Sequence, residues 1–146
     1  AHAVELLKQT ITSGSALHKF AEFVKAQGGD PEDVMIPGRL PVASEKIEAK
    51  AAADGFVTDI LAEQIGVACM TLGGGRETKE SAIDLSVGIC LKKKIGAPVS
   101  RGDVIAEIYA NDKKRGADAK KLVEDAYRYG EIAPEKRQMI RKIITE

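Results

Sequence analysis

The stretch IGAPVSRGDVIAEI, from Ile95 to Ile108, decides how the second part of this 146-residue chain folds. Gly96 and Gly102 stand where strands must turn, because glycine accepts backbone conformations that other residues avoid. Valine and isoleucine alternate with other residues along the segment, a period of two that is typical of a strand with one buried face. A shorter turn and strand, ADGFVTDI, occurs earlier at 53–60. The two segments predict a β-rich unit with tight glycine turns.

Further elements are predicted on both sides of these segments. Hydrophobic periodicity distinguishes strands, with a period of two, from helices, with a period of 3.6. The second of two predicted helices has Leu122, Ala126 and Tyr129 on one face, and Pro134 separates it from the last strand. The predicted strands are 42–49, 55–61, 87–93, 104–109 and 138–145, and the predicted helices are about 62–72 and about 114–129.

The first forty residues have helical spacing instead. Apolar residues recur at intervals of three and four, and SGS at 13–15 interrupts them. This pattern begins at Ala1 with no capping residue before it, so we expect the chain to start inside an element of something longer. We therefore expect an α+β protein with a helical segment at 1–40 and a β-rich domain at 41–146. The apolar positions are Val4, Leu7, Ile11, Leu17, Phe20 and Val24.

Composition excludes several classes of protein. Lysine and arginine number 22, as do aspartate and glutamate, and a nucleic-acid-binding protein usually has a basic excess. No apolar run is long enough to span a bilayer, so we expect no membrane contact. Two cysteines outside any disulfide framework favour a cytoplasmic protein. Cys69 and Cys90 have apolar neighbours and are expected to be buried, reduced thiols. His2 and His18 lack ligand spacing, so no metal and no cofactor are expected.

The glycine-rich segment GGGRETKE at 73–80 is the strongest candidate for a functional loop. A phosphate-binding loop would need a strand before it and a helix after it, so that backbone N–H groups face the anion. Here the glycines follow a predicted helix, and the Gly-Lys-Ser/Thr order is missing. The pattern favours the end of a helix followed by a mobile charged loop.

The turn-and-strand segments resemble those of biotinyl and lipoyl carrier domains. This resemblance implies a flattened β-barrel of the barrel-sandwich type, with covering helices. Carriers present a modified lysine at a hairpin tip, but the residues at 110–112 are Ala-Asn-Asp. Lys113 and Lys114 follow, at the start of a predicted helix. We expect the architecture without the attachment chemistry, because fold alone does not determine function. A carrier or protein-interaction module remains the alternative interpretation.

Three segments in order resemble the pyrimidine-nucleoside and thymidine phosphorylases. They are SGSALHKF followed by AQGGD at 13–30, IGVA through LGGGRETKE at 65–80, and IDLSVGI at 83–89. Ser15 departs from the family pattern, in which many members have lysine. The resemblance as a whole extends over nearly the whole chain.

The resemblance implies an enzyme of the glycosyltransferase type, which cleaves pyrimidine nucleosides reversibly with inorganic phosphate. The family's catalytic motifs belong to its N-terminal and middle parts, and we find no matching positions here. We therefore expect no catalytic residue in this chain and no activity from it alone. The full enzyme would be a homodimer. Within this chain we expect Gly74, Gly75, Arg76, Thr78 and Lys79 to form a loop that closes over the cleft.

Overall fold

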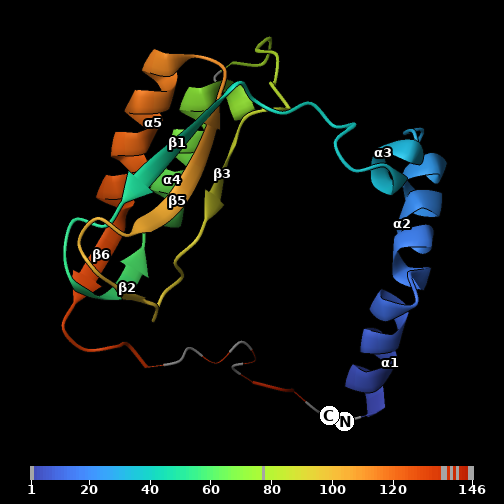
Figure 1. The fold of residues 1–146 in the computed structure, drawn as a ribbon, viewed down its shortest axis with the longest axis horizontal. Helices are drawn as coiled ribbons and strands as arrows, with labels where there is room; N and C mark the ends of the chain where they lie inside the picture. Colours follow the sequence, from blue (N-terminus) through green and yellow to red (C-terminus); the bar gives the residue numbers. More distant parts are fainter. Residues whose placement is uncertain (1, 77, 136–137, 139, 141, 145–146) are drawn as a thin grey trace. The chain divides into compact units, whose positions relative to one another are not determined.

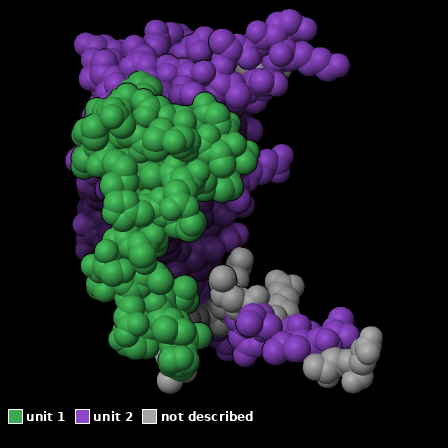
Figure 2. Space-filling view, turned by 90° about the vertical axis from the view of Figure 1, so that its right-hand side faces the viewer, with its two compact units in different colours: residues 1–41 green, residues 42–146 purple. Residues whose placement is uncertain are grey.

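The chain divides into two compact units, Ala1–Pro41 (unit 1) and Val42–Glu146 (unit 2), coloured separately in Figure 2. The structure is a computed structural model that describes residues 2–76, 78–135, 138, 140 and 142–144.

Unit 1 consists of helices α1 (His2–Thr12), α2 (Ser15–Ala26) and α3 (Glu32–Met35) (Figure 1). The break between the first two lies at Gly14, whose φ of +77° favours glycine. No described residue of α1 is buried, and α2 buries only Ala21. Unit 1 therefore has almost no core of its own. Its large exposed apolar side chains are Val4, Leu6, Leu7, Ile11, Leu17, Phe20, Phe23, Met35, Ile36 and Leu40.

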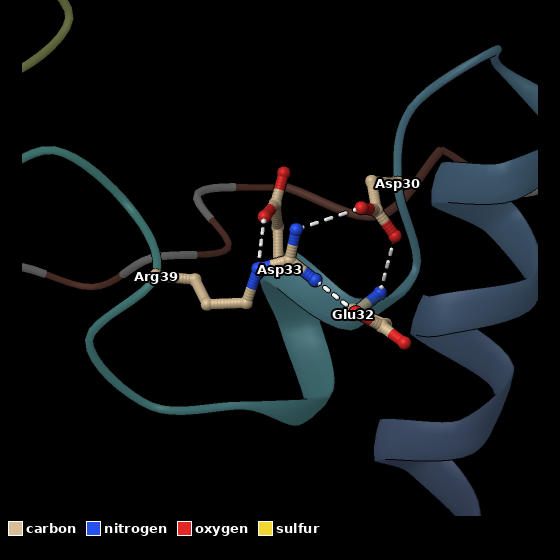
Figure 3. Close-up of polar contacts among 4 residues, drawn as sticks. All are labelled: Asp30, Glu32, Asp33 and Arg39. Atoms are coloured by element: carbon tan, nitrogen blue, oxygen red, sulfur yellow. Dashed lines mark hydrogen bonds and ion pairs between the residues drawn. The ribbon is translucent and has the colours of Figure 1, made fainter.

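Arg39 ties the end of unit 1 to α3 (Figure 3). Its Nη2 lies 2.9 Å from Asp30 Oδ2 and its Nε lies 3.3 Å from Asp33 Oδ1. Glu32 pairs with the same guanidinium. Asp30 also accepts a 2.9 Å hydrogen bond from the Glu32 backbone N–H, and this bond, with that from Arg39, lowers the pKa of Asp30. The chain leaving α3 is thus fixed by one cation among three carboxylates.

Unit 2 is a mixed α+β structure with two three-stranded antiparallel sheets. The first has the order β1 (Glu45–Lys50), β5 (Val104–Ala110), β3 (Gly88–Leu91), and the second has the order β4 (Pro98–Val99), β2 (Gly55–Ile60), β6 (Tyr127–Gly130). Helix α5 (Lys113–Ala126) packs on β1 and β5, and α4 (Ala62–Cys69) packs against α5 (Figure 1). Within the described residues the strands form two separate sheets and not one closed barrel.

The core of unit 2 lies between these sheets and helices. Its largest fully buried side chains are Val57 of β2, Ile105 and Ile108 of β5, and Val123 of α5. Burying each such side chain contributes about 1.5–3 kcal/mol relative to leaving it in water. Ile105 and Ile108 are three residues apart and so lie on opposite faces of β5, which is therefore buried on both faces and not on one alternating face.

The glycine turn before β2 is confirmed. Gly55 has a φ of +126°, and a Cβ on it would lie 2.5 Å from the Gly130 carbonyl oxygen. Only glycine permits both this conformation and the close approach of β6.

Several predicted elements were wrong. The helix predicted to about residue 129 ends at Ala126, and Tyr129 lies in strand β6 instead of on a helical face. Tyr127 explains why the helix ends there. Its hydroxyl donates to the backbone oxygens of Lys93 (3.0 Å) and Ile105 (3.2 Å), which hold the residue in the core as the start of β6. Strand β4 was not predicted. The helix predicted to Leu72 ends as α4 at Cys69 and continues in one π-helical segment, Met70–Gly74 (η1).

The last predicted strand, 138–145, includes residues outside the described part of the chain. Those that are described, among them Ile140 and Ile143, have no regular secondary structure. The expectation of two buried thiols was also wrong, because Cys69 is half-buried and Cys90 is exposed. Within the part of the chain that the structure describes, no helix has both the length and the apolar character needed to cross a membrane.

Candidate functional site

The base of the glycine-rich loop is formed by η1. Gly73 has a φ of +98°, which ends the helix, and its carbonyl oxygen accepts a 2.9 Å hydrogen bond from the Asp84 backbone N–H. A Cβ on Gly74 would lie 2.9 Å from Cys69 Sγ and 3.2 Å from the Cys69 oxygen. The first two glycines are therefore required by the backbone and by packing, as the predicted helix end implies.

The charged part of the loop is exposed. Arg76, Thr78 and Lys79 all lie at the surface. Thr78 begins a turn in which its backbone N–H donates to Ser81 Oγ (3.0 Å) and its oxygen accepts from the Ser81 N–H (3.2 Å). The turn gives the exposed segment some local order of its own.

A small polar pocket of about 160 Å³ lies beside the loop. Of the five residues predicted for the loop, only Gly75 lines it. The pocket brings in Arg115, from the first turn of α5, which sequence reasoning missed. The one local sign of a role for Arg115 was a basic residue soon after the strand predicted at 104–109. The segment that it faces across the pocket, residues 70–82, lies more than thirty residues earlier in the sequence. The lining residues are Met70, Gly73, Gly75, Ser81, Ala82 and Arg115.

Arg115 is anchored by its backbone and not by its guanidinium. Its N–H donates to Asp112 Oδ1 at 2.8 Å, so Asp112 caps α5. Its Nη1 lies 3.6 Å from the point where a Cβ on Gly73 would be. Among the described residues no carboxylate forms an ion pair with this guanidinium. The pocket therefore presents one positive group next to the loop base.

Asn111, at the end of β5, connects the loop base to its surroundings. Its Nδ2 donates to Asp84 Oδ2 (2.7 Å) and to Ser86 Oγ (2.8 Å), and its Oδ1 accepts from the Ser44 backbone N–H (2.9 Å). Ser86 also donates to Asp84 Oδ1 from its hydroxyl (2.6 Å) and its backbone N–H (2.9 Å). These bonds from Ser86, followed by that from Asn111, lower the pKa of Asp84. The Asp84 carboxylate is thus kept ionised as an acceptor.

The position of a carrier lysine is occupied by this network. Asn111 is hydrogen-bonded at the strand end, and Lys113 and Lys114 lie in α5, as predicted. Lys113 is paired with Glu45 (3.8 Å) and Lys114 with Asp118 (3.3 Å). Nothing in this geometry favours the carrier alternative.

The described residues hold no group of three or more histidine, cysteine, aspartate or glutamate side chains that could bind a metal ion. Unit 1 has an apolar groove of about 430 Å³ beside α2 and α3. Neither it nor the polar pocket gathers a set of residues with the geometry of acid–base catalysis.

Comparison with known proteins gives a family match. The family model "Pyrimidine nucleoside phosphorylase C-terminal domain" matches residues 56–130, which include all but the first residue of β2 and the whole of α4, the glycine-rich loop and α5.

Several proteins named pyrimidine-nucleoside phosphorylase are similar to this chain. One from Staphylococcus haemolyticus (strain JCSC1435) is 44% identical over 144 residues, which is 99% of this chain and 33% of the relative. One from Bacillus subtilis (strain 168) is 42% identical over 96% of the chain and 32% of the relative. One from Geobacillus stearothermophilus is 44% identical over 84% of the chain and 28% of the relative. The chain thus spans about a third of the length of these relatives, 33% in the first.

Proposed function

Because the chain belongs to the pyrimidine nucleoside phosphorylase C-terminal domain family, we propose that it is the C-terminal part of an enzyme that cleaves pyrimidine nucleosides with phosphate. The observation that carries the proposal is the similarity over 99% of the chain to a named phosphorylase, at 44% identity. The substrates are inorganic phosphate and a uridine- or thymidine-type nucleoside. The full enzyme acts as a homodimer in the cytoplasm, without a cofactor.

The proposed reaction transfers a pentosyl group. A phosphate oxygen attacks the anomeric carbon, the bond from that carbon to the base nitrogen breaks, and the base leaves with the electron pair. Pentose 1-phosphate is the second product. The transition state resembles an oxocarbenium ion, so the enzyme accelerates the reaction by positioning and by stabilising the leaving base. No residue of this chain is assigned to either task.

The proposed role of unit 2 is to form part of the wall around the substrates. Its two sheets, which face a common core, correspond in this proposal to the two halves of a barrel-sandwich. Gly74, Gly75, Arg76, Thr78 and Lys79 form a loop that closes over the cleft in the full enzyme. The exposure of Arg76, Thr78 and Lys79 supports this role, because they are free to contact a ligand.

The proposed role of unit 1 is to complete the large domain of the enzyme. Its support is the row of exposed apolar side chains on α1 and α2, since a monomeric protein seldom leaves so many in water. The parts of the enzyme that this chain does not span would cover them.

Phosphorolysis assays test the proposal directly. The 146-residue chain and the full-length enzyme that contains it would be compared with uridine and thymidine as substrates, by release of free base with and without phosphate. We expect phosphate-dependent release from the full enzyme and none from the chain alone. Activity of the isolated chain would mean that the chemistry lies within it, and an inactive full enzyme would refute the family's reaction for this protein.

A further inference from the structure

Two segments that are distant in sequence meet at the end of β5. One is the base of the glycine-rich loop, which is held through Asp84 and Ser86. The other is the segment by which the chain enters unit 2, represented by Ser44. Figure 1 shows the loop, the start of β1 and the start of α5 at the same end of unit 2. Asn111 lies at this meeting point and bonds to both segments.

The connection to the loop is short and charge-assisted. Asn111 Nδ2 lies 2.7 Å from Asp84 Oδ2, and the Asp84 backbone N–H donates to the Gly73 oxygen at 2.9 Å. A hydrogen bond to a carboxylate is stronger than one between neutral groups. Asn111 therefore restrains Gly73, the residue at which the helix ends and the loop begins.

Asn111 contacts the segment that enters unit 2 through the oxygen of the same side-chain amide. Asn111 Oδ1 accepts the 2.9 Å bond from the Ser44 N–H, just before β1 begins at Glu45. A side-chain amide is suited to this position because it has two donor hydrogens and an acceptor oxygen in one plane. Aspartate would keep the acceptor but lose both donors.

We propose that Asn111 is a positioning residue, which fixes the base of the glycine-rich loop relative to the point where the chain enters unit 2. A displacement of the entering chain is then transmitted to the loop through one side chain. The consequence for catalysis rests on the proposed function, in which the loop closes over the substrate. The restraint on the loop does not depend on that function and can be measured without substrate.

The test uses Asn111→Asp and Ser86→Ala in the full-length enzyme. Asn111→Asp removes both donors at constant size and adds a charge next to Asp84, and Ser86→Ala removes one acceptor and the hydroxyl that braces Asp84. Gln27→Glu is the matched control, because it makes the same amide-to-carboxylate change at an exposed position in unit 1. Hydrogen exchange of residues 73–81 and of β5 is followed by mass spectrometry.

We expect loop amides to exchange about tenfold faster in both variants, the size of effect that losing one or two hydrogen bonds produces. Exchange of β5 and of the control should be unchanged. Unchanged loop exchange in Asn111→Asp would overturn the inference. An equal acceleration in β5 would also overturn it, because it would indicate general destabilisation.

Steady-state kinetics separate this inference from the proposed function. A looser loop should raise KM and lower kcat, whereas a mere loss of folded enzyme lowers kcat and leaves KM unchanged. Faster loop exchange with unchanged kcat and KM would support the role of Asn111 in positioning. It would refute the proposal that the loop closes over the substrate.

Discussion

Arg76 is the residue of the loop whose removal we expect to weaken closure over the substrate most. It is exposed directly after three glycines, so its guanidinium can move with the loop toward an anionic substrate. A hydrogen bond to a charged group contributes about 1.5–3 kcal/mol, or roughly ten- to a hundredfold in affinity. We predict that Arg76→Ala in the full-length enzyme lowers kcat/KM by at least about tenfold on this ground. The kcat/KM of both enzymes is measured by phosphorolysis of uridine at varied phosphate concentration.

Arg101→Ala is the control for this substitution. Arg101 is also an exposed arginine, but it lies before β5, at the other end of that strand from Asn111. Its removal should leave turnover unchanged. Equal kinetics for Arg76→Ala and the unaltered enzyme would contradict the loop's proposed part in closure.

The sequence predicted the glycine-rich side of the site but not the residues at the end of β5 and in α5 that face it. Gly73 and Gly74 indicate the end of a helix in the sequence alone. The reasons lie nearby in the chain, because Gly73 has a positive φ and a Cβ on Gly74 would meet Cys69. Arg115 and Asn111 contribute through partners far along the chain, in the segment from Gly73 to Ser86. No local pattern specifies which residue will face that segment after folding.

At the scale of elements, Glu107 connects the three strands of the first sheet. Its Oε1 lies 2.6 Å from Lys46 Nζ of β1, and its Oε2 lies 2.8 Å from Lys92 Nζ, next to the end of β3. The hydrogen bonds from Lys46, Lys92 and then Tyr109 lower the pKa of Glu107 from 4.5 to about 2. An ionised Glu107 therefore stabilises the folded sheet.

The pH dependence of stability follows from this shift. A lowered pKa means that the contribution is fully present above 4.5, the ordinary pKa, and is lost as the pH falls toward about 2. We predict that Glu107→Gln is less stable than the unaltered chain at pH 7, and that the difference shrinks as the pH is lowered from 4.5. Urea unfolding of both proteins between pH 7 and pH 3 measures the difference.

Glu131→Gln provides the comparison for Glu107→Gln, since Glu131 is exposed and lies outside both sheets. It should unfold like the unaltered chain at every pH. A difference between Glu107→Gln and the unaltered chain that stays constant from pH 7 to pH 3 would show that Glu107 acts through packing and not through its charge.

The period of two and the valine and isoleucine content predicted β2 and β5, which bury Val57 in β2 and four residues in β5. They could not predict β4, which has two residues. They also missed β6, where Tyr127 directly follows α5 and the spacing of Leu122, Ala126 and Tyr129 continues to look helical. Pairing with β2 overrides that local pattern, because β6 and the hydroxyl of Tyr127 find partners elsewhere in unit 2.

At the scale of the whole molecule, the two units differ in how they can be stable. Unit 2 has a core that draws on both sheets and on the two helices α4 and α5. In unit 1, α1 has 11 residues and none of them is buried, and α2 has 12 residues, of which only Ala21 is buried. Helices shorter than about 12–15 residues are marginal in water without tertiary packing. The proposed role of unit 1 accounts for this, because we expect its helices to need apolar surface supplied from outside them.

This dependence gives a prediction that compares the chain with the full-length enzyme. In the 146-residue chain, the amides of α1 and α2 should exchange with solvent close to the rate of an unfolded peptide, because little burial opposes fraying. In the full enzyme the same amides should be protected by about a hundredfold or more, since covering Leu7, Ile11 and Phe20 adds burial of several side chains. The strand β5 is the internal reference and should be protected in both proteins. Equal protection of α1 in the chain and in the enzyme would contradict the role of unit 1 in completing the large domain, because it would mean that these helices need no partner.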